Sequence, residues 1–247
     1  MGCLALETAQ PVNLNASFQG ARLRAFASQD RQRHTVRVPI PLGTAEGSDT
    51  LFLALQTADG TETTFRAEVR VVGGGYGEER LELQPALLPL ADPSLDASEI
   101  EQLRTLTSGF SERWYLAEGM MTFPSTTLVS APYGIRRAFN DGPADRFHIG
   151  VDFIGAPGTP FSTSGPGVVV MVETLPIRGQ TTVIDHGWGV YSVYAHQNDR
   201  VVQPGMEVLA GQIIGTIGAS GRTTGSHLHW EVWVDGVPVH PRQWVDG

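Results

Sequence analysis

The chain has 247 residues, of which 41% are hydrophobic and 17% are charged, a composition typical of a globular protein. It carries 17 basic and 26 acidic residues, for a net charge of -9, and no basic run stands out, so nucleic acid is not expected as a partner. No apolar run approaches the roughly 18 residues that a membrane-spanning helix needs, so we expect no integral membrane segment.

The N-terminal sequence "MGCLAL" contains the single cysteine of the chain, Cys3, so an intrachain disulfide is excluded. The sequence has no basic region followed by a long apolar stretch and does not resemble an intact signal peptide. Two interpretations stay open. Either Cys3 is the lipid-anchor position of a cleaved lipoprotein precursor, or it is a free thiol near the terminus, which is the interpretation we favour.

Residues 11–85 alternate short apolar runs with turn signals, as in "RHTVRVPIPLG" and "DTLFLALQTADGTETTFRAEVRVVGGG". The pair Asp59-Gly60 in "TADGTE" favours a hairpin between two strands. The pattern therefore predicts an N-terminal β-sandwich-like domain over residues 1–88, without a catalytic constellation. His34 is the only histidine of this part, and we expect it to be exposed on a strand.

Residues 89–120 are predicted to form a linker that contains a helix. In "DPSLDASEIEQLRTLTSGF", Asp96 and Glu99 have the spacing of a capping box, and apolar residues follow at helical intervals. This pattern predicts a helix over about residues 96–108 between two domains.

From residue 121 to residue 247 the chain shows consecutive strand-like runs separated by Gly or Asn-Asp turns, such as "GVVVMVE", "VYSVYAH" and "HLHWEVWVDG". No helical stretches separate these runs, so parallel βαβ units are not expected. The chain is therefore predicted to be all-β and mainly antiparallel, with a C-terminal antiparallel β domain over residues 121–247.

Six of the seven histidines lie in this C-terminal part. In "HLHWEV", the strand period of two puts His227 and His229 on one face. In "RFHIGVDF", the same period puts His148 and Asp152 on one face, and the glycine between them leaves room for a close approach. His196 ends the apolar strand "VYSVYAH". Each group taken alone also has an ordinary explanation as a surface or strand-end polar residue.

Together these four histidines and one aspartate have the composition of a catalytic metal site. Zinc takes nitrogen and oxygen ligands, and a catalytic zinc site keeps one coordination position open for water. Two histidines and a carboxylate meet that need, and two further histidines could move protons during attack by water. In this interpretation one histidine of "HLH" binds the metal and the other stands beside it.

The segments "FHIGVD", "YAH" and "GSHLHWEV" resemble the three signatures of the lysostaphin-like, or LytM-type, zinc metallopeptidases. The similarity extends through nearly all of residues 121–247, whereas the N-terminal half is similar to the β domain that precedes the peptidase in some bacterial members. The resemblance implies that one Zn2+ ion per chain is bound by His148, Asp152 and His229. It implies that the catalytic histidines are His196 and His227. No ligand position is lost, so the chain does not resemble the non-catalytic regulators of the family.

The resemblance further implies a zinc-dependent endopeptidase that hydrolyses peptide bonds of bacterial peptidoglycan, in stem peptides or cross-links, and that is secreted or held in the cell envelope. We expect a monomer. The alternatives are a non-catalytic peptidoglycan-binding regulator of other cell-wall hydrolases and a zinc amidase. His186, in "DHG", is expected to be structural, and His240 is assigned no role.

Overall fold

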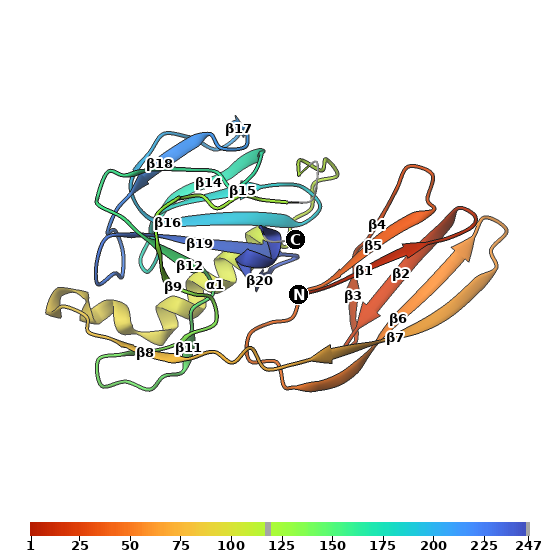
Figure 1. The fold of residues 1–247 in the computed structure, drawn as a ribbon, viewed down its shortest axis with the longest axis horizontal. Helices are drawn as coiled ribbons and strands as arrows, with labels where there is room; N and C mark the ends of the chain where they lie inside the picture. Colours follow the sequence, from red (N-terminus) through yellow and green to blue (C-terminus); the bar gives the residue numbers. More distant parts are fainter. Residues whose placement is uncertain (117–119, 246–247) are drawn as a thin grey trace. The chain divides into compact units, whose positions relative to one another are not determined.

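The computed structural model describes residues 1–116 and 120–245, and the arrangement of their strands is drawn in Figure 1. The end of the predicted linker, at residues 117–119, and the last two residues of the predicted C-terminal domain, 246–247, lie outside the described residues. Among the described residues, no helix is both long enough and apolar enough to cross a membrane.

The chain divides into two compact units, residues 1–74 and 75–247, and the first contains two antiparallel sheets. The first sheet has the order β1 (Gly2–Glu7), β5 (Arg33–Val38), β4 (Ala25–Ala27). The second has the order β3 (Ala21–Leu23), β2 (Val12–Phe18), β6 (Gly47–Thr57), β7 (Glu62–Val71). Side chains of β2, β5 and β6 share one apolar core, so the predicted sandwich of sheets is present. The predicted hairpin joins β6 to β7, and Gly60 has the positive φ of 87° that its turn requires.

His34 is buried, with 3% of its surface exposed, so the expectation of an exposed histidine is wrong. It lies on β5, the central strand of its sheet, and the period of two puts it on the same face as the buried Val36 and Val38. Its Nε2 lies 3.0 Å from the carbonyl oxygen of Arg31.

The second unit begins with a small three-stranded sheet. Strand β8 (Glu78–Leu81) pairs parallel with β10 (Arg136–Phe139), which pairs antiparallel with β11 (Arg146–Phe147) on its other side. All other strand pairs of the described residues are antiparallel, which confirms the predicted all-β, mainly antiparallel class.

A ten-stranded sheet forms the body of the second unit. Its main path has the order β17 (Glu207–Val208), β14 (Gly167–Leu175), β15 (Gly179–Asp185), β16 (Val190–Arg200), β19 (His227–Val234), β12 (Val151–Ile154), β9 (Val129–Ala131). The remaining strands are β13 (Pro160–Ser162), β18 (Ile213–Ile217) and β20 (Val237–Val239). Strand β19 lies between β16 and β12 and pairs with both (Figure 1). Its eight residues are almost entirely buried.

A 3-10 helix, η1 (Pro85–Ala91), leads into the one α-helix of the described residues, α1 (Pro93–Thr107). The helix begins three residues earlier than predicted, because Asp92 is the cap and accepts a hydrogen bond from the backbone N–H of Ser94, while Pro93 occupies the first turn. The predicted capping box is therefore wrong. A second 3-10 helix, η2 (Pro241–Trp244), lies near the C-terminus.

Helix α1 packs into the core of the second unit. Leu103 is completely buried, and its apolar neighbours come from β14, β15, β16 and β19, namely Met171, Leu175, Val183, Tyr191, Val193 and Trp233. Helix α1 lies within residues 89–120, which the sequence predicts as a linker, and it packs in the compact unit of residues 75–247.

His186 is completely buried in a polar network of the second unit. Its Nδ1 lies 2.7 Å from the carbonyl oxygen of Pro166, and its Nε2 lies 2.7 Å from Oγ of Ser192. Burial lowers the pKa of His186 to about 4, so the ring is neutral in the folded protein at neutral pH. This environment is the one expected of a structural histidine.

We expect His186 to make the protein sensitive to acid. An unfolded chain protonates this histidine near pH 6.5 and the folded one near pH 4, so stability is present above pH 6.5 and is lost as pH falls between these values. The loss between pH 7 and pH 5 is about 2 kcal/mol. Urea unfolding of the wild type and His186→Gln at both pH values measures it. An equal pH dependence of the two proteins would contradict the prediction.

Candidate metal centre

The structure brings His148, Asp152 and His229 together, and one ligand atom from each lies within 4.8 Å of the other two. Asp152 on β12 and His229 on β19 are direct partners in the antiparallel ladder, so their side chains lie on the same face. His148 comes just before β12. All three residues are buried, which separates this group from an ordinary cluster of surface acids and histidines.

The converging atoms are Nε2 of His148, Oδ1 of Asp152 and Nδ1 of His229. The oxygen lies 3.0 Å from the nitrogen of His148 and 2.7 Å from that of His229, and the two nitrogens are 3.0 Å apart. These three atoms surround one point, at which a single metal ion can contact all of them.

The second nitrogen of each ring faces a group that can only accept a hydrogen bond. Nδ1 of His148 lies 2.8 Å from the carbonyl oxygen of Pro132, and Nε2 of His229 lies 2.8 Å from Oε1 of Glu231. Those nitrogens must therefore carry the N–H, and in neutral rings the converging nitrogens present lone pairs. Two lone pairs and a carboxylate oxygen that point at each other repel one another unless a cation lies between them. The donor set thus fits a divalent metal ion.

The close packing of the three candidate ligand residues shifts their pKa values. Burial alone would raise the pKa of Asp152, but His148 and His229 hold it well below its ordinary value. Burial alone would lower the pKa of His229, but Asp152 and Glu231 outweigh burial and raise it. A proton on His229 therefore competes with a metal ion for the same site, so metal binding should release a proton.

Glu231 also belongs to the site, although it is not among the residues predicted from the sequence. It is fully buried, and its carboxylate accepts hydrogen bonds from His229, from Nε1 of Trp233 at 2.6 Å and from Nε of Arg178 at 2.8 Å. Burial would raise the pKa of Glu231, but chiefly Arg178 lowers it to about 2. The signal was present in "HLHWEV", because the strand period that pairs His227 with His229 also puts Glu231 on their face.

Gly150 lets His229 reach its position. A Cβ atom at residue 150 would lie 2.6 Å from Cε1 of His229 and 2.6 Å from the carbonyl oxygen of Trp230. The close approach that this glycine was expected to allow is therefore that of the ring of His229.

Gly150→Ala is expected to weaken metal binding by about 10–100-fold, because the new methyl group must displace the ring of His229 or the backbone of β19. Gly77→Ala is the matched control, since a Cβ there meets nothing within 4 Å. Competition with a chelating dye measures both affinities. Equal affinity in the two variants would show that the ring is not held as described.

His196 reaches the cleft through an unusual backbone conformation. Its neighbour Ala195 is the ladder partner of His229, so regular alternation would turn His196 to the opposite face. His196 instead has a φ of 59°, which is rare for a non-glycine residue, and its ring centroid lies 4.7 Å from that of His227. Its Nδ1 lies 2.8 Å from the carbonyl oxygen of Ser220, which leaves Nε2 for the cleft.

His227 lies beside the three-residue group. Its Nδ1 lies 2.9 Å from the carbonyl oxygen of Gly225, and its Nε2 lies 3.7 Å from Oδ1 of Asp152. Burial lowers the pKa of His227, and burial together with His227 and His229 lowers that of His196 well below its ordinary value. Both rings are therefore neutral near pH 7 and can accept a proton there.

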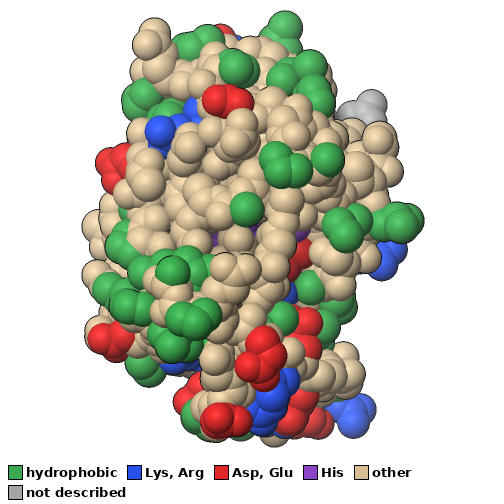
Figure 2. All heavy atoms as spheres, turned by 90° about the vertical axis from the view of Figure 1, so that its left-hand side faces the viewer, with side chains coloured by type: hydrophobic (Ala, Val, Ile, Leu, Met, Phe, Trp, Pro, Cys, Tyr) green, Lys and Arg blue, Asp and Glu red, His purple; other side chains and the backbone are tan. Residues whose placement is uncertain are grey.

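All five predicted site residues line one cleft of about 320 Å³. Figure 2 shows histidine surface only in small areas between the surrounding side chains, as expected of a recessed site. The wall also includes Arg137, Arg146 and Arg222. Cys3 is an exposed free thiol of the first unit, and His240 caps η2 by accepting a hydrogen bond from the backbone N–H of Arg242.

Comparison with known protein families matches residues 146–241 to the model of peptidase family M23. The matched range contains all five cleft residues of the candidate site. It leaves out α1 and strand β8, which belong to the same compact unit.

Two curated relatives are peptidoglycan DD-endopeptidase ShyA of Vibrio cholerae and DD-carboxypeptidase/endopeptidase Mpg of Neisseria meningitidis. ShyA is 46% identical over 93 residues, which are 38% of this chain and 22% of ShyA. Mpg is 36% identical over 118 residues, which are 47% of this chain and 26% of Mpg. The chain thus spans about a quarter of the length of these relatives.

A crystal structure of a Pseudomonas aeruginosa protein, named as a candidate M23 peptidase, has a TM-score of 0.70 to this structure. The match covers 99% of this chain and 92% of the other at 24% sequence identity. The two proteins therefore share their fold over nearly the whole chain.

Proposed function

Because residues 146–241 of the chain belong to peptidase family M23, we propose that this protein is a zinc-dependent endopeptidase that hydrolyses peptide bonds of bacterial peptidoglycan. The observation that carries the proposal is the convergence of two imidazole lone pairs and a carboxylate oxygen in a cleft that holds two further neutral histidines. A metal site with only a structural role would not need the two further histidines.

The proposed metal ligands are His148, Asp152 and His229. Zinc suits two imidazoles and one carboxylate, and when bound in such a site it polarises a carbonyl group and lowers the pKa of a water ligand to about 7. The carbonyl oxygen of Pro132 and the carboxylate of Glu231 hold the two rings in the tautomer that leaves the ligand nitrogens free.

The proposed catalytic histidines are His227 and His196. His227 is the better placed to take the proton from the attacking water, because its Nε2 faces the ligand group while Nδ1 is held by a backbone carbonyl. The protonated ring then returns the proton to the leaving amine. His196, whose ring lies against that of His227, also presents Nε2 as a proton acceptor, because its Nδ1 donates to the carbonyl oxygen of Ser220. Once Nε2 has taken a proton, it can donate a hydrogen bond to the oxyanion that develops on the scissile carbonyl.

The proposed substrate is a peptide of the bacterial cell wall, and the proposed location is the cell envelope or the medium outside it. ShyA and Mpg, to which part of this chain is similar, are named for DD-peptidase activity, and this supports a DD-peptide bond as the first one to test. The chain is proposed to act as a monomer without a nucleic-acid partner.

Digestion of purified peptidoglycan sacculi tests the proposal. We expect the wild type to release soluble fragments, a chelator to stop the release, and added Zn2+ to restore it. Binding to sacculi without release would instead support a non-catalytic regulator. Release that a chelator leaves unchanged would contradict the metal-dependent mechanism.

A further inference from the structure

We propose that helix α1 is part of the metal centre, with Glu99 as a positioning residue that holds the metal ligand His229 through Arg178 and Glu231. The inference rests on the metal site of the proposed function but not on its substrate. Helix α1 lies outside the range that matches family M23, so this role is not carried by the matched domain itself.

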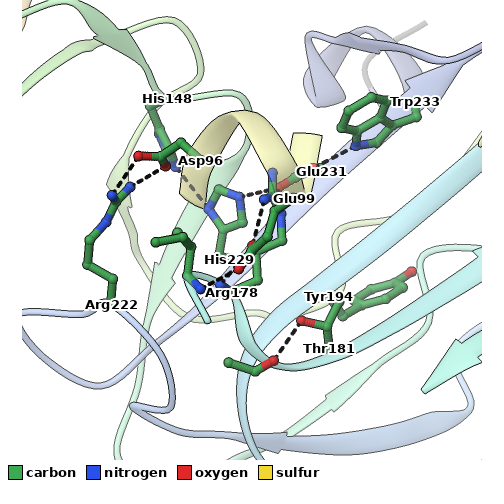
Figure 3. Close-up of polar contacts among 12 residues, drawn as sticks. Asp96, Glu99, His148, Arg178, Thr181, Tyr194, Arg222, His229, Glu231 and Trp233 are labelled. Atoms are coloured by element: carbon green, nitrogen blue, oxygen red, sulfur yellow. Dashed lines mark hydrogen bonds and ion pairs between the residues drawn. The ribbon is translucent and has the colours of Figure 1, made fainter. Parts of the chain in front are cut away.

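A continuous chain of contacts joins the helix to the ligand (Figure 3). Oε2 of Glu99 lies 3.1 Å from Nη1 of Arg178, and Nε of Arg178 donates to Oε1 of Glu231 at 2.8 Å. The same oxygen lies 2.8 Å from Nε2 of His229. All four residues are buried, so water does not screen these charges.

The shared oxygen makes the position of Arg178 important for His229. Oε1 of Glu231 accepts from both Arg178 and His229, whereas Oε2 is engaged by Nε1 of Trp233. Arg178 and His229 therefore share this oxygen. If the guanidinium of Arg178 were drawn closer to Glu231, it would displace His229 from the oxygen. His229 would then lose the partner that fixes its ring and makes its Nδ1 a stronger ligand.

Glu99 prevents that movement by holding Arg178 from the opposite side. Its carboxylate accepts hydrogen bonds from the guanidinium of Arg178 and from the backbone N–H groups of Ile177 and Arg178. Without the charge of Glu99, the buried guanidinium would be balanced by Glu231 alone and drawn to it. Leu103, completely buried one turn further along α1, anchors the helix that carries Glu99.

A second contact of the same kind supports the inference. Nη2 of Arg137 lies 2.8 Å from Oδ2 of the ligand Asp152, and the other side of Arg137 is paired with Glu79 of β8. Oδ2 is thereby occupied while Oδ1 faces the two histidines. In the N-terminal part of the second unit, Glu99 and Glu79 thus each hold an arginine. Arg178 is linked to His229 through Glu231, and Arg137 is bonded to Asp152 directly.

Glu99→Gln is expected to weaken zinc binding by about tenfold, the lower end of the range for residues behind a metal ligand, and to change the absorption bands of bound Co2+. Glu101→Gln is the matched control, because that carboxylate lies on the same helix but is largely exposed. Competition with a chelating dye gives the affinities, and circular dichroism shows that each variant is folded. The control should bind zinc within about twofold of the wild type.

Two further variants keep the test decisive. The losses from Glu99→Gln and Glu231→Gln should not add in the double variant, because both act on one oxygen. If Glu99→Gln fails to fold, Arg178→Lys keeps the charge without the fork geometry and should weaken zinc binding in the same way.

Zinc affinity unchanged in folded Glu99→Gln, or losses that add fully in the double variant, would overturn the inference. If Arg178→Lys is the variant used, unchanged zinc affinity in it has the same meaning. These measurements need no substrate. A protein that binds zinc as described and yet releases nothing from sacculi would refute the proposed function and leave the inference standing.

Discussion

Replacement of any one metal ligand is expected to remove zinc and activity together. His148→Ala, Asp152→Ala and His229→Ala each leave two ligand atoms in a buried site where the structure places three within 4.8 Å. The Asp152 variant has an additional cost, because it leaves the guanidinium of Arg137 without one of its two carboxylate partners. Elemental analysis after dialysis should find about one zinc per chain in the wild type and little in the variants.

His240→Ala is the matched control for the ligand variants. This histidine caps η2 and is not among the residues that line the cleft, so the variant should keep its zinc and its activity. Near-stoichiometric zinc in all three ligand variants would show that the metal is bound elsewhere or not by these residues.

Removal of the second pair of histidines is expected to separate metal binding from catalysis. His227→Ala and His196→Ala should keep most of their zinc, because their nitrogens are not members of the three-atom group. Each should lose about 10²–10⁴-fold in turnover, the usual contribution of a general acid–base group. Turnover of a cell-wall peptide and zinc content, measured on the same preparations, give both quantities.

The double variant sharpens this prediction. The ring centroids of His196 and His227 lie 4.7 Å apart, so both residues act on the same reacting groups and their losses should not add fully. Loss of zinc in His227→Ala would mean that the ligand and catalytic roles within "HLH" are exchanged. Full activity in either single variant would remove that residue from the mechanism.

Local periodicity was sufficient to predict part of the candidate site. The period of two correctly placed His227 and His229 on one strand face, and the glycine at position 150 indicated a close approach. The all-β, mainly antiparallel class followed from short apolar runs between turns. These features depend on residues that are close together in the sequence, so a local sequence pattern is sufficient to predict them.

Other features depend on residues far apart in the sequence. The left-handed backbone at His196, which brings its ring into the cleft, runs against the alternation that the sequence suggests. Helix α1 looked like part of a linker, because its burial depends on strands that begin only at residue 167, and the local pattern cannot pair the helix with them. Glu99 looked like a capping residue, although its partner is Arg178.

The proposed reaction is hydrolysis of a peptide bond by attack of water. Mass spectrometry of the fragments released from sacculi in water labelled with heavy oxygen tests it most directly. We expect new peptide carboxyl groups that each carry one labelled oxygen, together with new free amino groups on amino acids, and no such products from His229→Ala. Fragments cut only within the glycan strand, or only between sugar and peptide, would contradict it.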